Sequence, residues 1–378
     1  MEVRVPFLDL RAQYRALQAE IHAAIARVLE DAAFVRGTYV EAFERAYAQA
    51  YGVPHCIGVG NGTDALFIAL RALGIGPGDE VLVPALTWIS TSETVSLTGA
   101  QPVFVDIEPE YYTLDPEQAE ARITERTRAI IPVHLYGQPA AMEAIMALAQ
   151  RYGLMVIEDC AQAHFARYHG RLVGTFGIVG TFSFYPAKNL GAYGDAGAVI
   201  TADDSVADFA RKFANHGSLT KHEHEFEGIN SRLDGLQAAI LHVKLRYIHT
   251  WNARRIEHAQ HYTELLSSIE ELTLPSIRPH CTHVFHLYVI RTPWRDELQQ
   301  FLAERGIQTQ IHYPRALPFV PAYQHRGHRP EDFPIAWQYQ HQVLSLPLYP
   351  ELTHTQLEHV CRSIQEFFAH QRRRFLRP

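Results

Sequence analysis

"SFYPAKNLGAYGDAG", residues 183–197, places a single lysine, Lys188, between an aromatic run and a string of glycines. It continues the apolar run "GTFSFY", which we predict to be a strand. A lysine at the edge of a sheet, flanked by Tyr185 and Pro186, is poorly placed for a merely solvated role. A partly desolvated lysine has a lowered pKa, and its neutral amine can form a Schiff base with an aldehyde. The segment therefore indicates a sheet that carries a nucleophilic lysine beyond the end of a strand.

Six further apolar runs alternate with segments of helical spacing: "HCIGVG", "EVLVPA", "PVFVDI", "AIIPVHLYG", "LMVIEDC" and "GAVIT". Short apolar strands that alternate with helices predict an α/β domain with a mainly parallel sheet covered on both faces. Two amphipathic helices precede it, and Gly52 is expected to end the second.

After Thr201 the sequence becomes largely helical. We predict one long helix over residues 232–266 as the bridge to a smaller C-terminal domain, with "HVFHLYVI" as a strand and "RDELQQFLAERG" as a helix. The predicted division is a large domain over residues 1–248 and a small domain over residues 249–378.

Composition excludes several classes of protein. The chain has 378 residues, of which 47% are hydrophobic and 20% charged, and a formal net charge of −7, which argues against a nucleic-acid partner. No apolar run approaches the roughly 20 residues that span a bilayer, so we expect a cytoplasmic protein without a membrane partner. The four cysteines are far apart and suggest neither a disulfide framework nor a zinc site. The histidines of "HCTHVFH" lie in a strand-like run without a second ligand cluster, so we predict no metal.

A turn that suits a phosphate lies in "GVGNGTDALFIALRAL", where Gly62 and Thr63 stand between a strand and a helix. Glycine lets the backbone approach a ligand, and the first N–H groups of a helix favour an anion. A purely structural turn is the alternative. The spacing departs from GxGxxG at Thr63, which disfavours a nicotinamide dehydrogenase.

Asp159 stands at the end of the apolar run "LMVIED", next to Glu158. A carboxylate there is costly to desolvate without a cation or several donors. Asp159 is therefore either the cap of a helix over "CAQAH" or the partner of a cationic cofactor group. A phosphate turn, a strand-end aspartate and a later lysine together indicate pyridoxal phosphate, which needs all three.

The chain resembles the DegT/DnrJ sugar-nucleotide aminotransferases, a branch of the fold type I pyridoxal phosphate enzymes. The likeness covers nearly the whole chain, from "PFLDLRAQY" through "GNGTDAL", "GDEVLVPALTW", "VIEDCAQAH" and "FSFYPAKNLGAYGDAGAVIT" to "GINSRLDGLQAA", "IHYP" and "VLSLPLYPEL". It implies a large α/β/α domain with a mainly parallel seven-stranded sheet and a smaller α+β C-terminal domain.

The resemblance implies a role for each matching residue. Lys188 forms the Schiff base with the cofactor and later moves the proton at the reacting carbon, while Asp159 keeps the pyridine nitrogen protonated. The other implied cofactor contacts are Gln162 at the phenolic oxygen, Trp88 on the ring face, Gly62, Thr63 and Ser183 at the phosphate, and Asn230 from a second subunit. The implied substrate-binding residues are Tyr185, Arg232, His312 and Tyr313. Because Asn230 crosses a subunit boundary, the implied working unit is a homodimer with shared active sites.

The implied reaction moves an amino group from L-glutamate to C3 of a dTDP-3-keto-6-deoxyhexose, through pyridoxamine phosphate. Amination at C4 of a dTDP- or UDP-4-keto sugar is the alternative, and a non-catalytic sensor built on this fold is another. Two departures from the family pattern bear on the sugar pocket. Phe165 stands where relatives usually carry glycine and Phe319 where a histidine is common, and both are expected to alter that pocket.

Overall fold

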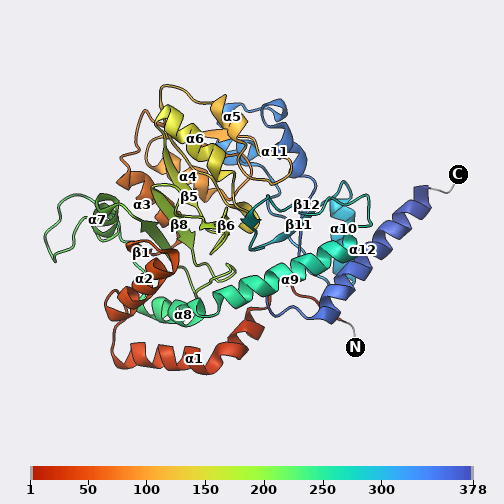
Figure 1. Cartoon of the computed structure of the whole chain (residues 1–378), viewed down its shortest axis with the longest axis horizontal. Helices are drawn as coiled ribbons and strands as arrows, with labels where there is room; N and C mark the ends of the chain where they lie inside the picture. The colour runs from red at the N-terminus through yellow and green to blue at the C-terminus, as the bar shows by residue number, and fades with distance from the viewer. Residues whose placement is uncertain (1–2, 376–378) are drawn as a thin grey trace.

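A seven-stranded sheet forms the centre of the computed structural model, which describes residues 3–375 (Figure 1). Its strands are β1 (His55–Val59), β2 (Glu80–Pro84), β3 (Gln101–Val105), β4 (Thr127–Ile130), β5 (Met155–Asp159), β8 (Val179–Ser183) and β9 (Gly197–Thr201). The order is β1-β9-β8-β5-β4-β2-β3, and only β9 runs antiparallel to its neighbours. The prediction of a mainly parallel sheet built from these seven runs is confirmed.

Helices cover both faces of this sheet. One face packs against α1 (Leu10–Glu30), α2 (Thr38–Tyr51), α6 (Met142–Tyr152) and α8 (Gly235–Leu245), and the other against α3 (Gly62–Ala72), α4 (Ser90–Leu97) and α7 (Asp204–Phe213). Successive residues of β1, Cys56 and Ile57, belong to the two different cores because strand side chains alternate between faces. The short helix α5 (Pro116–Glu120) also packs on α6. As predicted, α2 ends at Gly52, which adopts a left-handed conformation with φ of 68°.

The C-terminal elements form a third core. They are α9 (Ile248–Leu266), β11 (Tyr288–Arg291), α10 (Arg295–Glu304), β12 (Val343–Leu346) and α12 (His354–Phe375), with β11 and β12 in an antiparallel pair. Val5 joins this core and bridges to Ile307, whereas Ala336 and Tyr339 of α11 (Pro334–Tyr339) pack in a core of the large sheet. The chain thus crosses between the two parts more than once, and the division at residue 248 stays a prediction.

Two local predictions were wrong. The long helix is two helices, because α8 ends at Leu245 and α9 begins at Ile248; between them Arg246 and Tyr247 both bind Glu20 of α1 through their side chains. These tertiary contacts, absent from any local pattern, end the first helix.

The predicted strand "HVFHLYVI" begins only at Tyr288. The residues before it bind a loop instead: Val284 donates its N–H to Gly137 and Leu287 donates its N–H to Tyr136, both in η1 (Leu135–Gly137). Just upstream, β10 (Cys281–Thr282) joins β6 (Arg167–Tyr168) and β7 (Arg171–Leu172) in a small sheet.

Three short 3-10 helices, η2 (Leu317–Phe319), η3 (Pro321–Arg326) and η4 (Pro330–Asp332), complete the fold. Within residues 3–375, every helix is too short or too polar to cross a bilayer.

Candidate active site

The candidate residues gather at the carboxyl edge of the sheet. Asp159 is the last residue of β5, Ser183 is the last of β8, and Gly62 opens α3 just after β1. The carboxyl ends of parallel strands meet at one edge of an open sheet, which is where ligands bind in such folds.

Gly62 and Thr63 form a cradle with Ser183. A Cβ atom built on Gly62 would stand 2.6 Å from the Ser183 Cβ, so only glycine fits. The Thr63 hydroxyl lies 2.7 Å from that of Ser90, and Asn61 caps α3 by accepting a 2.8 Å hydrogen bond from the N–H of Asp64. The N–H groups of Gly62 and Thr63 bind no acceptor within residues 3–375 and lie at the positive end of the helix dipole. The cradle suits a phosphate.

Asp159 is buried, and burial raises the pKa of its carboxyl group. One oxygen accepts the N–H of Ala161 at 3.1 Å and the other accepts the hydroxyl of Thr91 at 3.0 Å, which partly offsets that cost. The alternative of a helix cap is wrong, because residues 160–163 form turns and not a helix. The Asp159 carboxylate can therefore bind a cationic group of a ligand.

Lys188 is half-buried, and the loss of water around its amine makes the charged form less favourable. Burial lowers the pKa of Lys188 to about 8, although the Asp159 charge opposes this shift. Burial also lowers the pKa of His164 to about 3 and that of His312 to about 4, so the imidazoles near Lys188 are neutral. Asp159 is thus the nearby anion, and a reactive fraction of the amine exists at neutral pH.

Gln162 links the site to the C-terminal elements. Its Oε1 accepts the N–H of Tyr136 at 2.6 Å, and its Nε2 donates to the Tyr313 hydroxyl at 2.9 Å. The Tyr313 ring lies 5.9 Å from the Trp88 ring at an angle of 43°. Trp88 is 57% exposed, so its indole face is free to cover a flat ring.

The remaining predicted residues lie in three settings. His312 bonds through Nδ1 to the Ser345 hydroxyl at 2.8 Å, and Tyr185 is exposed. Asn230 is also exposed, and its side chain has no hydrogen-bond partner in the described part of the chain. Arg232 lines a cavity of about 140 Å³ between α2, β1 and α7, whose lining includes neither Lys188 nor Asp159. The structure therefore does not bring Arg232 to the Lys188 site of its own chain.

The sequence did not reveal several supporting residues. Thr91 binds Asp159 from α4, and the imidazole of His164 bonds to the Ser183 carbonyl at 2.9 Å and to the Tyr47 hydroxyl at 3.0 Å. The run of hydroxyls in "WISTSET" after a predicted strand was the one signal for Thr91. Such a run is common at the start of any helix.

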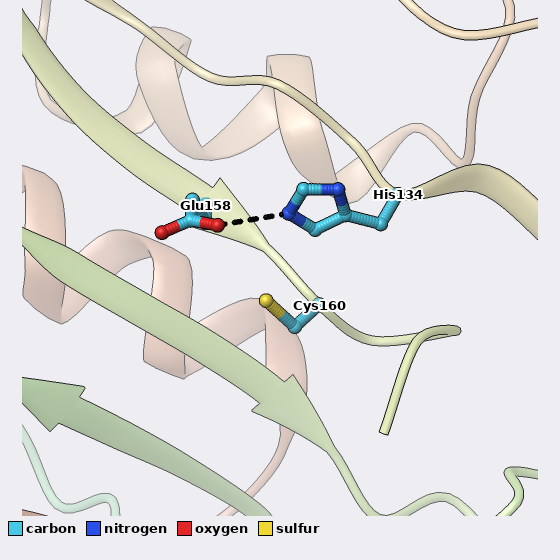
Figure 2. Close-up of side chains that lie close together, drawn as sticks. All are labelled: His134, Glu158 and Cys160. Carbon is cyan, nitrogen blue, oxygen red and sulfur yellow. Dashed lines mark hydrogen bonds and ion pairs between the residues drawn. The ribbon is translucent and has the colours of Figure 1, made fainter. Parts of the chain in front are cut away.

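Next to the site, His134, Glu158 and Cys160 offer three candidate metal-ligand atoms within 4.8 Å of one another (Figure 2). Their hydrogen bonds account for the arrangement. Glu158 accepts Nε2–H of His134 at 3.0 Å, and His134 accepts the N–H of Ala140 through Nδ1. The Glu158 carboxylate also accepts the N–H groups of Gly174, Phe176 and Gly177. The imidazole and the carboxylate thus brace β5, and the absence of a metal stays a prediction.

The comparison with known families addresses the whole arrangement. The model of the DegT/DnrJ/EryC1/StrS aminotransferase family matches residues 15–365. The chain belongs to this family. The aminotransferase class predicted from the sequence is therefore confirmed.

Similar members of the family carry two kinds of name. The "Pleiotropic regulatory protein" of Geobacillus stearothermophilus is 47% identical over 97% of this chain and 100% of its own. The "dTDP-3-amino-3,4,6-trideoxy-alpha-D-glucose transaminase" of Streptomyces venezuelae is 47% identical over 96% of both chains.

Solved structures of the family agree with the fold. The crystal structure of S. venezuelae DesV in complex with a ketimine intermediate matches with a TM-score of 0.95 and 47% identity, covering 97% of this chain and 98% of that one. A Bacillus subtilis relative with bound cofactor PMP has a TM-score of 0.91 and 32% identity, covering 98% and 86%. The predicted fold type I architecture and the pyridoxal phosphate cofactor are confirmed.

The residues of this aminotransferase fit that cofactor. A Cβ at Gly62 would collide with Ser183, so the cradle holds no side chain there; the Asp159 carboxylate forms no ion pair within residues 3–375; and Lys188 offers an amine of lowered pKa. Phosphate, pyridinium and aldehyde are the three groups that the cofactor presents.

Proposed function

We propose that this enzyme transfers the amino group of L-glutamate to C3 of a dTDP-3-keto-6-deoxyhexose, in the biosynthesis of a deoxyamino sugar. Two observations support the substrate. The S. venezuelae transaminase of dTDP-3-amino-trideoxyglucose is 47% identical to this chain over 96% of both chains. The S. venezuelae DesV structure shares the fold of this chain and is also 47% identical to it. The chemistry rests on one arrangement, a Lys188 amine that feels the charge of the buried Asp159 carboxylate.

When bound, pyridoxal phosphate supplies an aldehyde and an electron-withdrawing ring. Lys188 supplies the amine that holds the aldehyde, and its Nζ later moves the proton at the amino-bearing carbon of the substrate. Asp159 keeps the proton on the ring nitrogen, because a carboxylate in a buried site stabilises a neighbouring cation. The helix start at Gly62 and Thr63 and the Ser183 hydroxyl bind the phosphate.

The side chains above the sheet edge orient the ring and the sugar. Trp88 would cover one face of the ring. Gln162 Nε2 donates one N–H to the Tyr313 hydroxyl, and its second N–H would serve the phenolic oxygen. Tyr185, His312 and Tyr313 line the sugar side of the site. Burial raises the pKa of Tyr313, so its hydroxyl stays protonated and can donate to a sugar oxygen.

The working unit in this proposal is a homodimer. Asn230 of the partner subunit completes the phosphate site. Arg232, which lines a separate cavity in its own chain, stays a candidate for holding an anionic group of the substrate. Phe34 and Val35 are exposed apolar side chains, which favours a protein–protein contact over this surface. The surface lies close to Asn230 and Arg232, because the backbone of Val35 bridges to that of Asp234.

Subunit mixing tests the shared site. We expect Lys188→Ala and Asn230→Ala each to lack most activity, and a refolded equal mixture to recover about a quarter of the wild-type rate. Half of the random dimers are hybrids, and each hybrid has one site with both residues intact. No recovery from stable mixed dimers would place Asn230 at its own chain's site or outside any site.

Colour and product analysis test the reaction itself. Purified protein should be yellow and should bleach with L-glutamate, and mass spectrometry should detect an aminated product from a 3-keto dTDP-sugar. Lys188→Ala should lose both the colour change and turnover. Products formed only from 4-keto dTDP- or UDP-sugars would establish the C4 alternative.

A second candidate is a regulatory role, which the name of the 47% identical Geobacillus relative favours. A non-catalytic sensor would bind the cofactor and fail to turn over any sugar of the panel. Retention of Lys188, Asp159 and Ser183 favours the enzyme. The cytoplasmic location stays a prediction.

A further inference from the structure

Lys244 of α8 is a buried lysine that the proposed reaction does not use. It is 0% exposed, and in the described part of the chain it forms no ion pair. Burial lowers the pKa of Lys244 to about 7, with Glu351 as the charge that opposes the shift. An apolar side chain would fill the same space without the cost of desolvating an amine. The amine therefore has a local purpose.

That purpose is visible in its contacts. The Lys244 Nζ donates a 2.7 Å hydrogen bond to the carbonyl of Gly191 and lies 4.2 Å from the centre of the Tyr193 ring. Gln237, seven residues earlier on the same face of α8, accepts the N–H of Tyr193 at 2.8 Å. Two α8 side chains thus hold residues 191–193, which follow Lys188 in the chain. Lys244 binds the carbonyl of Gly191, and Gln237 binds the N–H of Tyr193.

Gly191 passes this contact on to the turn that carries Lys188. A Cβ built on Gly191 would stand 2.3 Å from the carbonyl oxygen of Pro186 and 2.9 Å from that of Tyr185. Tyr185 in turn accepts the N–H of Lys188 at 2.8 Å. The backbone at Gly191 is therefore in direct contact with the turn whose last residue is the nucleophile.

We propose that Lys244 is a positioning residue for Lys188: its buried amine fixes the Gly191 carbonyl, and Gly191 fixes the turn over residues 185–188. This inference rests on the proposed role of Lys188. Without the Lys244 donor, the Gly191 carbonyl loses its partner in a buried place, and residues 184–196 open more often.

Two readouts test the proposal in the full-length protein: amide hydrogen exchange of residues 184–196 in the cofactor-loaded enzyme, and borohydride trapping on Lys188 of pyridoxal phosphate titrated into the apoenzyme, followed by peptide mass spectrometry. In Lys244→Met, exchange over 184–196 should rise about fivefold or more, since an unsatisfied buried carbonyl costs about 1–3 kcal/mol. The cofactor concentration for half-maximal trapping should rise by a similar factor, while exchange in β11 and β12 stays unchanged.

Val243→Ala is the matched control, because Val243 is the neighbouring buried residue of α8 and packs in the core. It should lower global stability without selective exchange over 184–196. If Lys244→Met does not fold, Lys244→Gln, too short to reach Gly191, takes its place. Unchanged exchange over 184–196, or an equal rise in β11 and β12, would overturn the proposal. Failure of wild-type protein to trap the cofactor on Lys188 would instead refute the proposed function and leave the exchange result standing.

Discussion

Gly62 at the start of α3 lies against Ser183 at the end of β8, so closely that a Cβ on Gly62 would stand 2.6 Å from the Cβ of Ser183. This contact brings the first N–H groups of a helix and a strand-end hydroxyl to the same point. Both segments have to keep their positions for the cradle to hold a phosphate.

Gly62→Ala should therefore weaken cofactor binding. The added methyl group displaces Ser183 or the helix start, and we expect the dissociation constant of pyridoxal phosphate to rise about tenfold or more, as the loss of one charge-assisted hydrogen bond would cause. Absorbance titration of the apoenzyme measures it. Gly76→Ala is the control, because a Cβ at Gly76 would meet only the Thr98 carbonyl, at 3.9 Å. Equal affinities in the two variants would contradict the cradle.

Thr91→Val should move the pH dependence of the reaction. The Thr91 hydroxyl donates to Asp159, which favours the ionised carboxylate. Its loss raises the pKa of Asp159 further above its usual value, so the carboxylate protonates at a higher pH. We expect the acid limb of kcat/KM to shift upward by about one pH unit, with the loss recovered as pH rises.

Thr94→Val is the matched control for that change. Thr94 lies one turn further along α4, is buried, and donates its hydroxyl to the Ser90 carbonyl rather than to Asp159. Its acid limb should coincide with that of the wild type. A similar shift in both variants would point to a general disturbance of α4.

His283 should make the protein sensitive to mild acid. Burial lowers its pKa to about 3, so it stays neutral in the folded state while the unfolded chain takes up a proton below about 6.5. The unfolded state thus binds more protons between these values, and stability falls as pH decreases from 6.5 towards 3. At pH 5 this amounts to about 2 kcal/mol relative to pH 7.

Urea unfolding at pH 7, 6 and 5 measures that loss. His283→Asn keeps an acceptor for the Phe285 N–H and removes the titrating ring, so its unfolding free energy should fall less steeply with acid. His222→Asn, at an exposed position, should retain the wild-type slope. Parallel slopes for wild type and His283→Asn would show that His283 is already protonated when folded.

Phe165 lies in an aromatic core and not beside the substrate residues, so the expectation that it alters the sugar pocket finds no support in its contacts. Its ring packs 4.7 Å from that of Tyr51, 4.9 Å from that of His249 and 5.9 Å from that of Tyr47. Its φ of 64° is the left-handed conformation that glycine adopts without strain.

Two substitutions at Phe165 separate packing from backbone strain. Both Phe165→Ala and Phe165→Gly lose the ring and should destabilise the fold by about 3 kcal/mol or more. Phe165→Gly should be the milder by about 1 kcal/mol, because glycine accepts the positive φ. Urea unfolding measures the difference in stability. The KM for the sugar should stay unchanged in both variants, and a changed KM would show that Phe165 does affect the sugar pocket.

Phe319 has a different setting. It packs 4.8 Å from the partly exposed Trp337 and 6.2 Å from Phe333, at the end of η2. Its effect on the sugar pocket stays a prediction.

Local patterns predicted much of the fold and of the site. The seven strands of the large sheet were readable because strands buried on both faces are short apolar runs. The roles of Gly62, Asp159 and Lys188 could be predicted because a glycine, a carboxylate and an amine beyond the ends of apolar strands each need a specific reason to be there. The break after α8 and the late start of β11 were missed, because Glu20 and the Tyr136–Gly137 backbone, each far away in sequence, decide them.

The sequence by itself determined the order of strands and helices and the identity of the reactive groups, since both depend on residue type and spacing along the chain. Only the tertiary structure decided how those groups are tuned. The lowered pKa of Lys188, the Thr91 donor to Asp159 and the brace from Lys244 all arise from atoms that folding brings together from distant segments. Desolvation and hydrogen bonding depend on distance in space, which no local pattern encodes.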